Sequence, residues 1–164
     1  MQMPLRAIDQ LWTDQTANRA ISYSSQPCNG YPRTMSISFA KITKGATYSR
    51  QALAELWGYA SFHAIARGVV TPREDNKIVL FVTEEKQPSA EQYADRLSAN
   101  TLHWEGPTDH FAEDRMLKAL STGDEIHLFY RERHHSQFTY FGRLEVIGQE
   151  LRTDKPSQFT FHII

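Results

Sequence analysis

The chain has 164 residues, of which 40% are hydrophobic, so it is long enough for one folded domain with a hydrophobic core. Its 18 basic and 19 acidic side chains give a formal net charge of −1, which gives no overall support for nucleic-acid binding, so that such a function would need a local basic face. No apolar run approaches the roughly 20 residues of a membrane helix, and the single cysteine, Cys28, excludes an internal disulfide. We therefore predict a cytoplasmic protein with a single domain over 1–164 that contacts no membrane.

The first predicted elements lie in an N-terminal extension, residues 1–47. Apolar spacing predicts a short helix over 4–12, and two prolines with an Asn-Gly pair predict a loop at 20–34. In the segment TMSISFAKI apolar and polar residues alternate, which predicts a strand over 34–42.

The middle of the chain predicts two short helices and the clearest strand. Ser49 can cap a helix that ends at Gly58, and a second short helix follows over 61–68. The segment NKIVLFVTEE, 76–85, has β-branched and aromatic residues on both faces, which is typical of a buried strand. Residues 89–97 are compatible with a helix or a loop.

The last third predicts a short strand at 101–105, a helix over 110–121, and three alternating strands at 125–133, 138–148 and 158–164. Consecutive strands with short connections favour antiparallel pairing. The predicted fold is therefore α+β, with a curled antiparallel sheet or a small β-barrel and short helices packed on its rim.

The sequence contains no motif that indicates catalysis, a metal or a cofactor. Glycine-rich phosphate loops and the GxSxG nucleophile motif are absent. Cys28 lies in a Pro-Cys-Asn-Gly turn without a basic neighbour that would activate its thiol. His134 and His135 are adjacent on a predicted hairpin, and neighbours in a strand rarely chelate one metal ion. We predict no enzymatic activity, no metal and no cofactor.

Aromatic residues also occur beside polar ones, where a core does not require them. Trp104 lies between His103 and Glu105, directly before a Gly-Pro turn, and Tyr130 precedes Arg131. Aromatic faces next to cations can stack on nucleobases while the cations contact phosphates.

Aromatic residues also build cores, and we expect this role for Trp57, Phe62 and Phe129. For Trp104 both roles stay open. Alternation in 125–133 does not decide whether the face of Tyr130 or the opposite face is the buried one.

Residues 48–164 resemble a known family, the uncharacterised domain at the C-terminal end of helicase-type restriction proteins that also carry a phospholipase-D-type nuclease. The matching segments, in order, are YSRQALAELWG, Gly68, IVLFVTEEK, LHWEG, IHLFYRER and FTYFGRLEVIG. The family's middle motif reads aromatic-His-Trp followed by Gln-Ser, whereas Glu105-Gly106-Pro107 follows the tryptophan here.

This family is similar to the PUA-like barrels, which include the SRA domains that read modified cytosine in DNA. The resemblance implies a recognition module for modified double-stranded DNA, of the 5-methyl- or 5-hydroxymethylcytosine type, in a restriction or defence system. A nuclease or helicase subunit is the implied protein partner. In such a module the modified base rotates out of the duplex into an aromatic pocket, at a cost of a few kcal/mol.

Trp104 and Arg131 stand at family motif positions, and chemistry and proximity suggest the other site residues. The predicted base pocket consists of Trp104, His103, Glu105, Tyr59 and Tyr130, and the predicted phosphate contacts are Arg131, Arg133, His134 and Arg143.

Three alternatives stay open at this point. Related barrels bind RNA, and a protein-interaction module that docks a nuclease or helicase subunit fits the near-neutral charge. A small hydrolase could use His103, Glu105 or Asp109, although no nucleophile–base spacing supports it.

Overall fold

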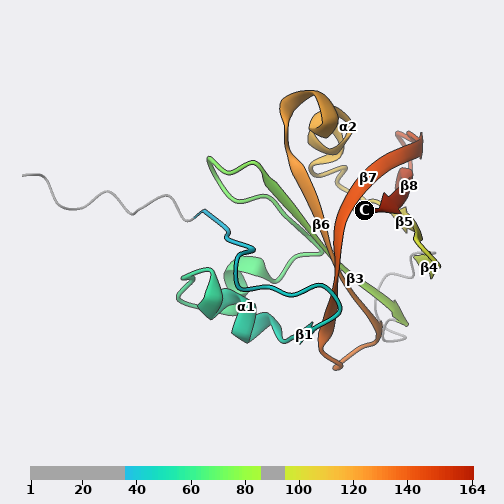
Figure 1. Cartoon of the computed structure of the whole chain (residues 1–164). Coiled ribbons are helices and arrows are strands. Elements are labelled where there is room, and N and C mark those ends of the chain that lie inside the picture. Colours follow the sequence, from blue (N-terminus) through green and yellow to red (C-terminus); the bar gives the residue numbers. More distant parts are fainter. Residues whose placement is uncertain (1–35, 86–94) are drawn as a thin grey trace, which may run out of the picture. The chain divides into compact units, whose positions relative to one another are not determined.

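The computed structural model describes residues 36–85 and 95–164, which lie in one compact unit, Pro32–Ile164 (Figure 1). The helix predicted over 4–12 and the loop predicted at 20–34 lie outside the described residues, and the single-domain prediction for the whole chain stays a prediction. The elements in order are β1 (Thr47–Tyr48), α1 (Arg50–Leu56), the 3₁₀ helix η1 (Phe62–Ile65), β2 (Val69–Val70), β3 (Lys77–Glu85), β4 (Arg96–Ser98), β5 (Thr101–Glu105), α2 (Glu113–Thr122), β6 (Glu125–Arg133), β7 (Phe138–Glu150) and β8 (Gln158–Ile163).

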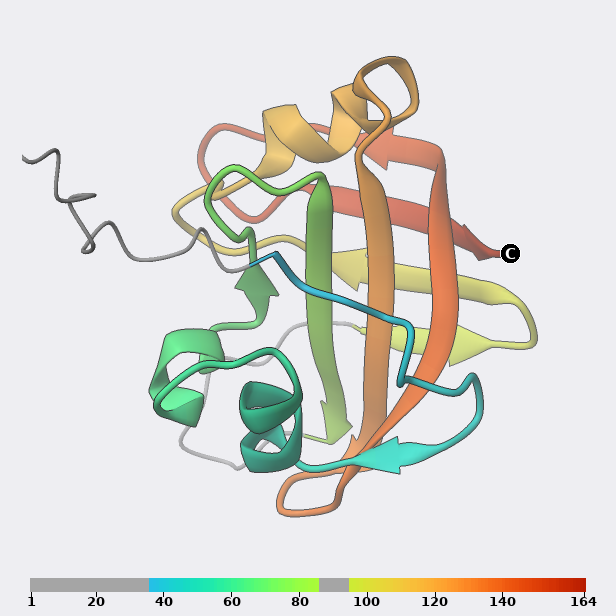
Figure 2. The same ribbon diagram turned by 60° about the vertical axis from the view of Figure 1, so that its left-hand side comes forward.

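The strands form one mixed sheet in the order β2-β3-β6-β7-β8-β5-β4, and β1 pairs with β7 (Figure 2). All neighbouring strands are antiparallel except β3 and β6, which are parallel with Ile78 opposite Ile126. The connection between these two strands contains β4, β5 and α2, so it is long enough for a parallel crossover. The α+β class is confirmed, but the prediction of a purely antiparallel sheet was wrong at this pair.

The sheet is also open. Within the described residues β2 and β4 are the two ends of the strand order and do not pair with each other. The alternative of a closed β-barrel is therefore wrong for this chain. Closure needs hydrogen bonds between the first and last strands, and hydrophobic alternation does not report on such pairing.

The strands predicted at 76–85, 101–105 and 125–133 are confirmed almost to the residue. The strand predicted over 34–42 was wrong, because residues 36–42 contain no strand. Ile37 is nevertheless buried and the Phe39 ring stacks on that of His127 with centroids 3.7 Å apart. The segment alternates because it lies on the core without pairing in the sheet.

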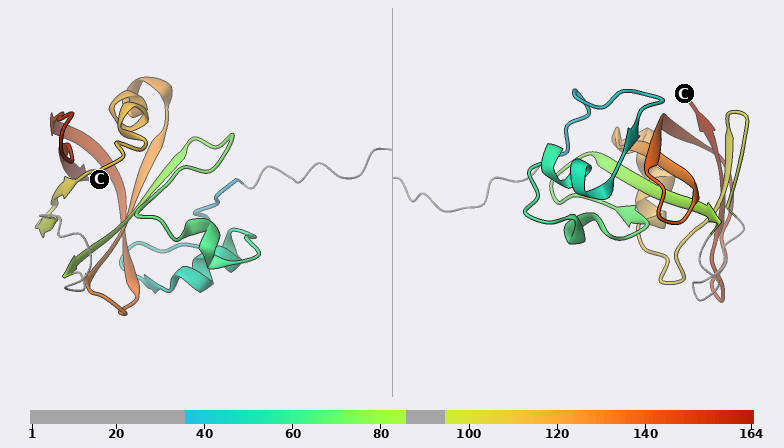
Figure 3. Two further views of the ribbon diagram at one scale, coloured as in Figure 1. Left: turned by 180° about the vertical axis from the view of Figure 1, so that it is seen from behind. Right: turned by 90° about the horizontal axis from the view of Figure 1, so that it is seen from below.

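Both faces of the β3–β6 pair are buried, which answers the question that alternation left open in 125–133. Leu80 and Leu128 belong to the hydrophobic cluster that includes Met116 of α2, called here the α2-side cluster. Phe81 and Phe129 belong to a second cluster, the α1-side cluster, which includes Leu53 of α1. The two helices therefore cover opposite faces, and Figure 3 shows α1 and η1 on one side of β3 and β6 with β5 and β8 on the other.

Candidate functional site: a cavity between the two ends of the sheet

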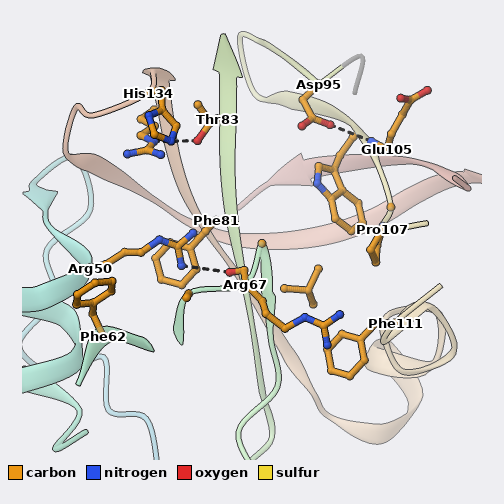
Figure 4. Close-up of a pocket in the computed structure, with 16 residues that line it drawn as sticks. Arg50, Phe62, Arg67, Phe81, Thr83, Asp95, Glu105, Pro107, Phe111 and His134 are labelled. Carbon is orange, nitrogen blue, oxygen red and sulfur yellow. Dashed lines mark hydrogen bonds between the residues drawn. The ribbon is translucent and has the colours of Figure 1, made fainter. Parts of the chain in front are cut away.

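A cavity of about 470 Å³ lies between the two ends of the open sheet (Figure 4). Val69 of β2 and Phe81 of β3 line one side, and Trp104 of β5 lines the other. β2 and β3 stand at one end of the strand order, and β5 stands near the other end. The cavity therefore lies in the gap that pairing between the two ends would fill in a closed barrel. Cavities of roughly 300–1,000 Å³ are typical of small-molecule sites.

Trp104 is both a core residue and a wall of this cavity. Its ring packs on Phe159 and Phe161 at centroid distances of 5.8 and 6.0 Å, and only 7% of the residue is exposed. Leu102 and Trp104 lie on the inner face of β5 because side chains alternate along a strand. The packing fixes the ring while its remaining surface borders the cavity.

Two carboxylates lie beside Trp104. Asp95 accepts a hydrogen bond from the Glu105 backbone N–H at 3.0 Å, and Glu105 accepts one from the Gln158 side-chain amide, also at 3.0 Å. Asp95 is buried and lines the cavity. The Glu105 side chain follows Trp104 along β5 and therefore lies with Gln158 on the outer face of the sheet. This end of the cavity presents the Asp95 carboxylate next to an aromatic surface.

A buried polar network holds the turn that follows Trp104. The Gly106 N–H donates to the Ser157 carbonyl at 2.8 Å, and the Ser157 hydroxyl donates to Glu113 at 2.9 Å. The other oxygen of Glu113 lies 3.0 Å from Nδ1 of His110. A Cβ at position 106 would lie 2.9 Å from that oxygen, so an alanine there would displace the Glu113 carboxylate from this network.

The opposite side of the cavity carries two half-buried arginines. Arg50 is the first residue of α1, whose N-cap Ser49 accepts a hydrogen bond from the Ala52 N–H at 3.0 Å. Its guanidinium donates to the carbonyls of Ile65 and Arg67 and lies 4.1 Å from the centre of the Phe81 ring.

Arg131 approaches the cavity from β6. Its Nε donates to the Thr83 hydroxyl at 2.8 Å, and its Nη1 donates to the Ser136 carbonyl at 3.1 Å. Burial lowers the pKa of Arg131, while burial and the nearby positive charge of Arg131 lower the pKa of Arg50 to about 10. Both pKa values are lowered because burial partly removes the positive guanidinium groups from water.

Arg67 and His134 lie at the rim of the cavity and are exposed. Arg67 pairs with Asp109 at 2.6 Å and lies 4.7 Å from the centre of the Phe111 ring. The hydrogen bond from Arg67 lowers the pKa of Asp109.

The structure brings four of the predicted site residues together around the cavity: Trp104, Glu105, Arg131 and His134. It also places Arg50, Arg67 and Asp95 there, which the sequence analysis did not select. Arg50 lies inside the matching segment YSRQALAELWG and Arg67 directly precedes Gly68, so motif position could have indicated both. No sequence pattern indicated Asp95.

The remaining predicted base-pocket residues lie elsewhere. His103 is exposed on the outer face of β5, 3.5 Å from the Thr160 hydroxyl. Tyr130 belongs to the α2-side cluster, and its hydroxyl donates to Glu84. Tyr59 borders a separate small hollow. Strand alternation explains the first two positions, because the neighbours of Trp104 and Arg131 along a strand face the other way.

The two other predicted phosphate contacts also lie away from the cavity. Arg133 is exposed at the end of β6, 3.5 Å from Glu85. Arg143 borders a second cavity of about 380 Å³ beside α2, where its guanidinium is 3.9 Å from Glu125.

Within residues 36–85 and 95–164, no group of three or more His, Cys, Asp or Glu side chains is placed to hold a metal ion. No helix in this part of the chain is both long and apolar enough to cross a membrane.

The fold and the cavity define an α+β domain built on an open, mixed sheet whose two ends enclose a pocket lined by aromatic and charged residues. The chain belongs to the family described as "Domain of unknown function (DUF3427)", whose model matches residues 42–161. This range contains all of the motifs on which the sequence resemblance rests, so the predicted relation to a family of uncharacterised domains is confirmed at that level.

Among solved structures, the chain is similar to the DNA modification-dependent restriction endonuclease AspBHI, with a TM-score of 0.46 and 13% sequence identity. The similarity covers 74% of this chain and 72% of that chain. Comparison with curated protein sequences gave no match.

Proposed function

We propose that this chain is a DNA-binding recognition module that reads a modified cytosine, of the 5-methyl or 5-hydroxymethyl type, after the base has rotated into the cavity beside Trp104. The module performs no catalytic step and acts as the specificity part of a restriction or defence system, with a nuclease or helicase subunit as its protein partner. Its open sheet is a relative of the PUA-like and SRA-like barrels that the sequence resembles.

One observation carries the proposal: a single cavity has an aromatic wall with the Asp95 carboxylate at one end and guanidinium groups at the other. A flipped nucleotide has the same polarity, with a flat base at one end and a phosphate at the other. Trp104 offers a fixed ring against which a base can pack, and aromatic contacts of this kind contribute about 1–3 kcal/mol per base.

The carboxylate of Asp95 favours cytosine over thymine. Asp95 is an acceptor-only group when ionised, and acidic side chains recognise cytosine by accepting a hydrogen bond from its N4 amino group. Thymine carries an oxygen in place of this amino group, so the same carboxylate would repel it.

The test measures binding of the full chain to duplexes that are identical except for one cytosine, which is plain, 5-methylated or 5-hydroxymethylated. We expect tighter binding to one modified duplex, and loss of this preference in Trp104→Phe, which keeps an aromatic ring in the core but reduces its area. Trp57→Phe, a matched change outside the cavity, should keep the preference. A single-stranded RNA of the same sequence tests the RNA-binding alternative, because an RNA reader depends on the 2′-hydroxyl.

Equal affinity of the wild-type chain for all three duplexes would overturn modified-base reading. An unchanged preference in both Trp104→Phe and Trp104→Ala would overturn the assignment of the pocket. No affinity for any nucleic acid at low salt, with a protein partner co-purifying, would establish the protein-interaction alternative instead.

A further inference from the structure

A second hollow of about 320 Å³ lies next to the cavity beside Trp104, and the two share Arg50, Phe62 and Arg131 in their linings. The second hollow extends from the start of α1 to the β6–β7 hairpin, where Ser49 and Gln137 line it. The two arginines therefore stand at the junction between two spaces, and a ligand longer than one base would pass them.

Both guanidinium groups are held rigidly at this junction. Each contacts the ring of Phe138, at 5.1 Å for Arg50 and 4.3 Å for Arg131. Arg50 uses Nη1 for its two backbone carbonyls, and Arg131 uses Nε and Nη1 for Thr83 and Ser136. Neither Nη2 atom donates a hydrogen bond to another described residue, so each arginine keeps donors for a ligand.

The arginine pair also lacks a counter-charge in the part of the chain that the structure describes. Neither Arg50 nor Arg131 forms an ion pair there, although two like charges partly removed from water repel each other. Five other described arginines pair with carboxylates: Arg67, Arg115, Arg133, Arg143 and Arg152. Arg73 and Arg96 form no ion pair with a described residue either, but both are exposed to water, whereas Arg50 and Arg131 are half-buried. An anion bound between the two guanidinium groups would balance this charge.

We propose that Arg50 and Arg131 together bind one backbone phosphate of the strand whose base enters the cavity, and that the second hollow takes the sugar-phosphate segment next to it. This inference rests on the proposed function for the identity of the ligand, but the anion site itself follows from the arginine pair. Arginine suits the role because its planar donors match two oxygens of one phosphate group. The site makes Arg50 a binding residue that contributes affinity without reading the base.

The first experiment measures thermal unfolding of the full chain in inorganic phosphate and in chloride at equal ionic strength. We expect phosphate to raise the unfolding temperature of the wild type, and the increase to disappear in Arg50→Gln and in Arg131→Gln. Arg152→Gln is the matched control, because it removes the same charge from an arginine that lines neither hollow. Equal stabilisation of all four proteins would overturn the anion site.

The second experiment measures duplex binding at two salt concentrations. Charge-assisted hydrogen bonds predict that Arg50→Gln weakens binding to plain and modified duplexes alike, by about tenfold or more, and lowers the salt slope by about one. Arg50→Lys should recover only part of the affinity, since lysine keeps the charge but loses the planar fork.

The outcomes separate the two proposals. Suppose that Arg50→Gln and Arg131→Gln bind both duplexes like the wild type, while Trp104→Phe loses the preference for the modified duplex. This result would overturn the phosphate site and support the proposed function. If no duplex binds but phosphate still stabilises the chain through Arg50, the proposed function falls and the site takes a small phosphate ester.

Discussion

Trp57 and Trp104 lie in the two hydrophobic clusters on opposite faces of the β3–β6 pair, and both are less than a tenth exposed, at 4% and 7%. The indole of Trp57 packs against Phe39 and Phe129, and its Nε1 donates to the Ser38 carbonyl at 3.1 Å. Trp104 packs against Phe159 and Phe161 and also borders the cavity.

Burial alone does not separate a residue that only stabilises the fold from one that also lines a site. Both tryptophans stabilise the fold, but Trp57 uses its polar atom within the protein, whereas Trp104 lies beside a cavity with charged neighbours. The two regions should therefore respond differently to substitution, and four measurements test this difference.

The largest effect is expected at Trp57. Trp57→Ala removes a fully packed ring from the α1-side cluster and should lower the free energy of unfolding by about 3–5 kcal/mol, measured by urea denaturation. The preference for a modified duplex should persist in the protein that stays folded. A loss below about 1 kcal/mol would mean that the α1-side cluster is not the scaffold described here. Leu120→Ala, at the exposed surface of α2, is the control and should change stability little.

The next effect concerns pH and lies in the same region, where His127 is buried against Phe39 and the Tyr140 hydroxyl. Burial lowers the pKa of His127 to about 4, whereas histidine in an unfolded chain titrates near 6.5. Between these values the unfolded chain binds a proton that the folded chain does not, so stability falls as the pH drops from about 6.5 to 4.

The loss should amount to at most about 3 kcal/mol. Urea denaturation at pH 7 and pH 4.5 should give a smaller difference for His127→Gln than for the wild type. If both proteins lose the same stability, His127 is not the group that couples this region to pH.

A moderate effect is expected in the Trp104 region. Gly106→Ala would force a methyl group against Glu113 and should cost about 1–3 kcal/mol, with weaker binding of the modified duplex because the turn after Trp104 shifts. Gly148→Ala is the matched control, since its Cβ would meet Thr160 at an ordinary 3.6 Å. Equal stability of the two variants would show that the Glu113 network does not position the turn.

The smallest effect is expected for Arg67→Gln at the rim of the cavity. The Arg67–Asp109 pair is exposed on both sides, and such pairs contribute little to stability. Denaturation curves of the variant and the wild type should coincide, while the pKa of Asp109, followed by NMR, should rise toward its ordinary value once the hydrogen bond is gone. An unchanged Asp109 pKa would contradict the pairing.

Periodicity was enough to locate most strands. In β5 every second side chain enters the core, so alternation marks the strand. In β3 and β6 both faces are buried, so a continuous run of β-branched, aliphatic and aromatic residues marks them. The same rule failed at 36–42, because an extended segment that lies on a core alternates in the same way whether or not its backbone pairs.

The candidate site was only partly predictable. Trp104 and Arg131 were found at motif positions, but His103, Tyr130 and Arg143 were selected for their chemistry and their closeness in sequence. Neighbours along a strand point to opposite faces, so residues adjacent to a site residue in sequence are often the ones that cannot reach the site.

The α+β class, the five longer strands β3, β5, β6, β7 and β8, and the two α-helices could be predicted from the amino-acid sequence, because they follow from local periodicity and capping. The parallel pairing of β3 and β6, the open sheet, and the shared cavity of Arg50, Asp95 and Trp104 emerged only from the folded structure. These properties depend on contacts between residues far apart in the chain, and such contacts leave no periodic trace in a single sequence.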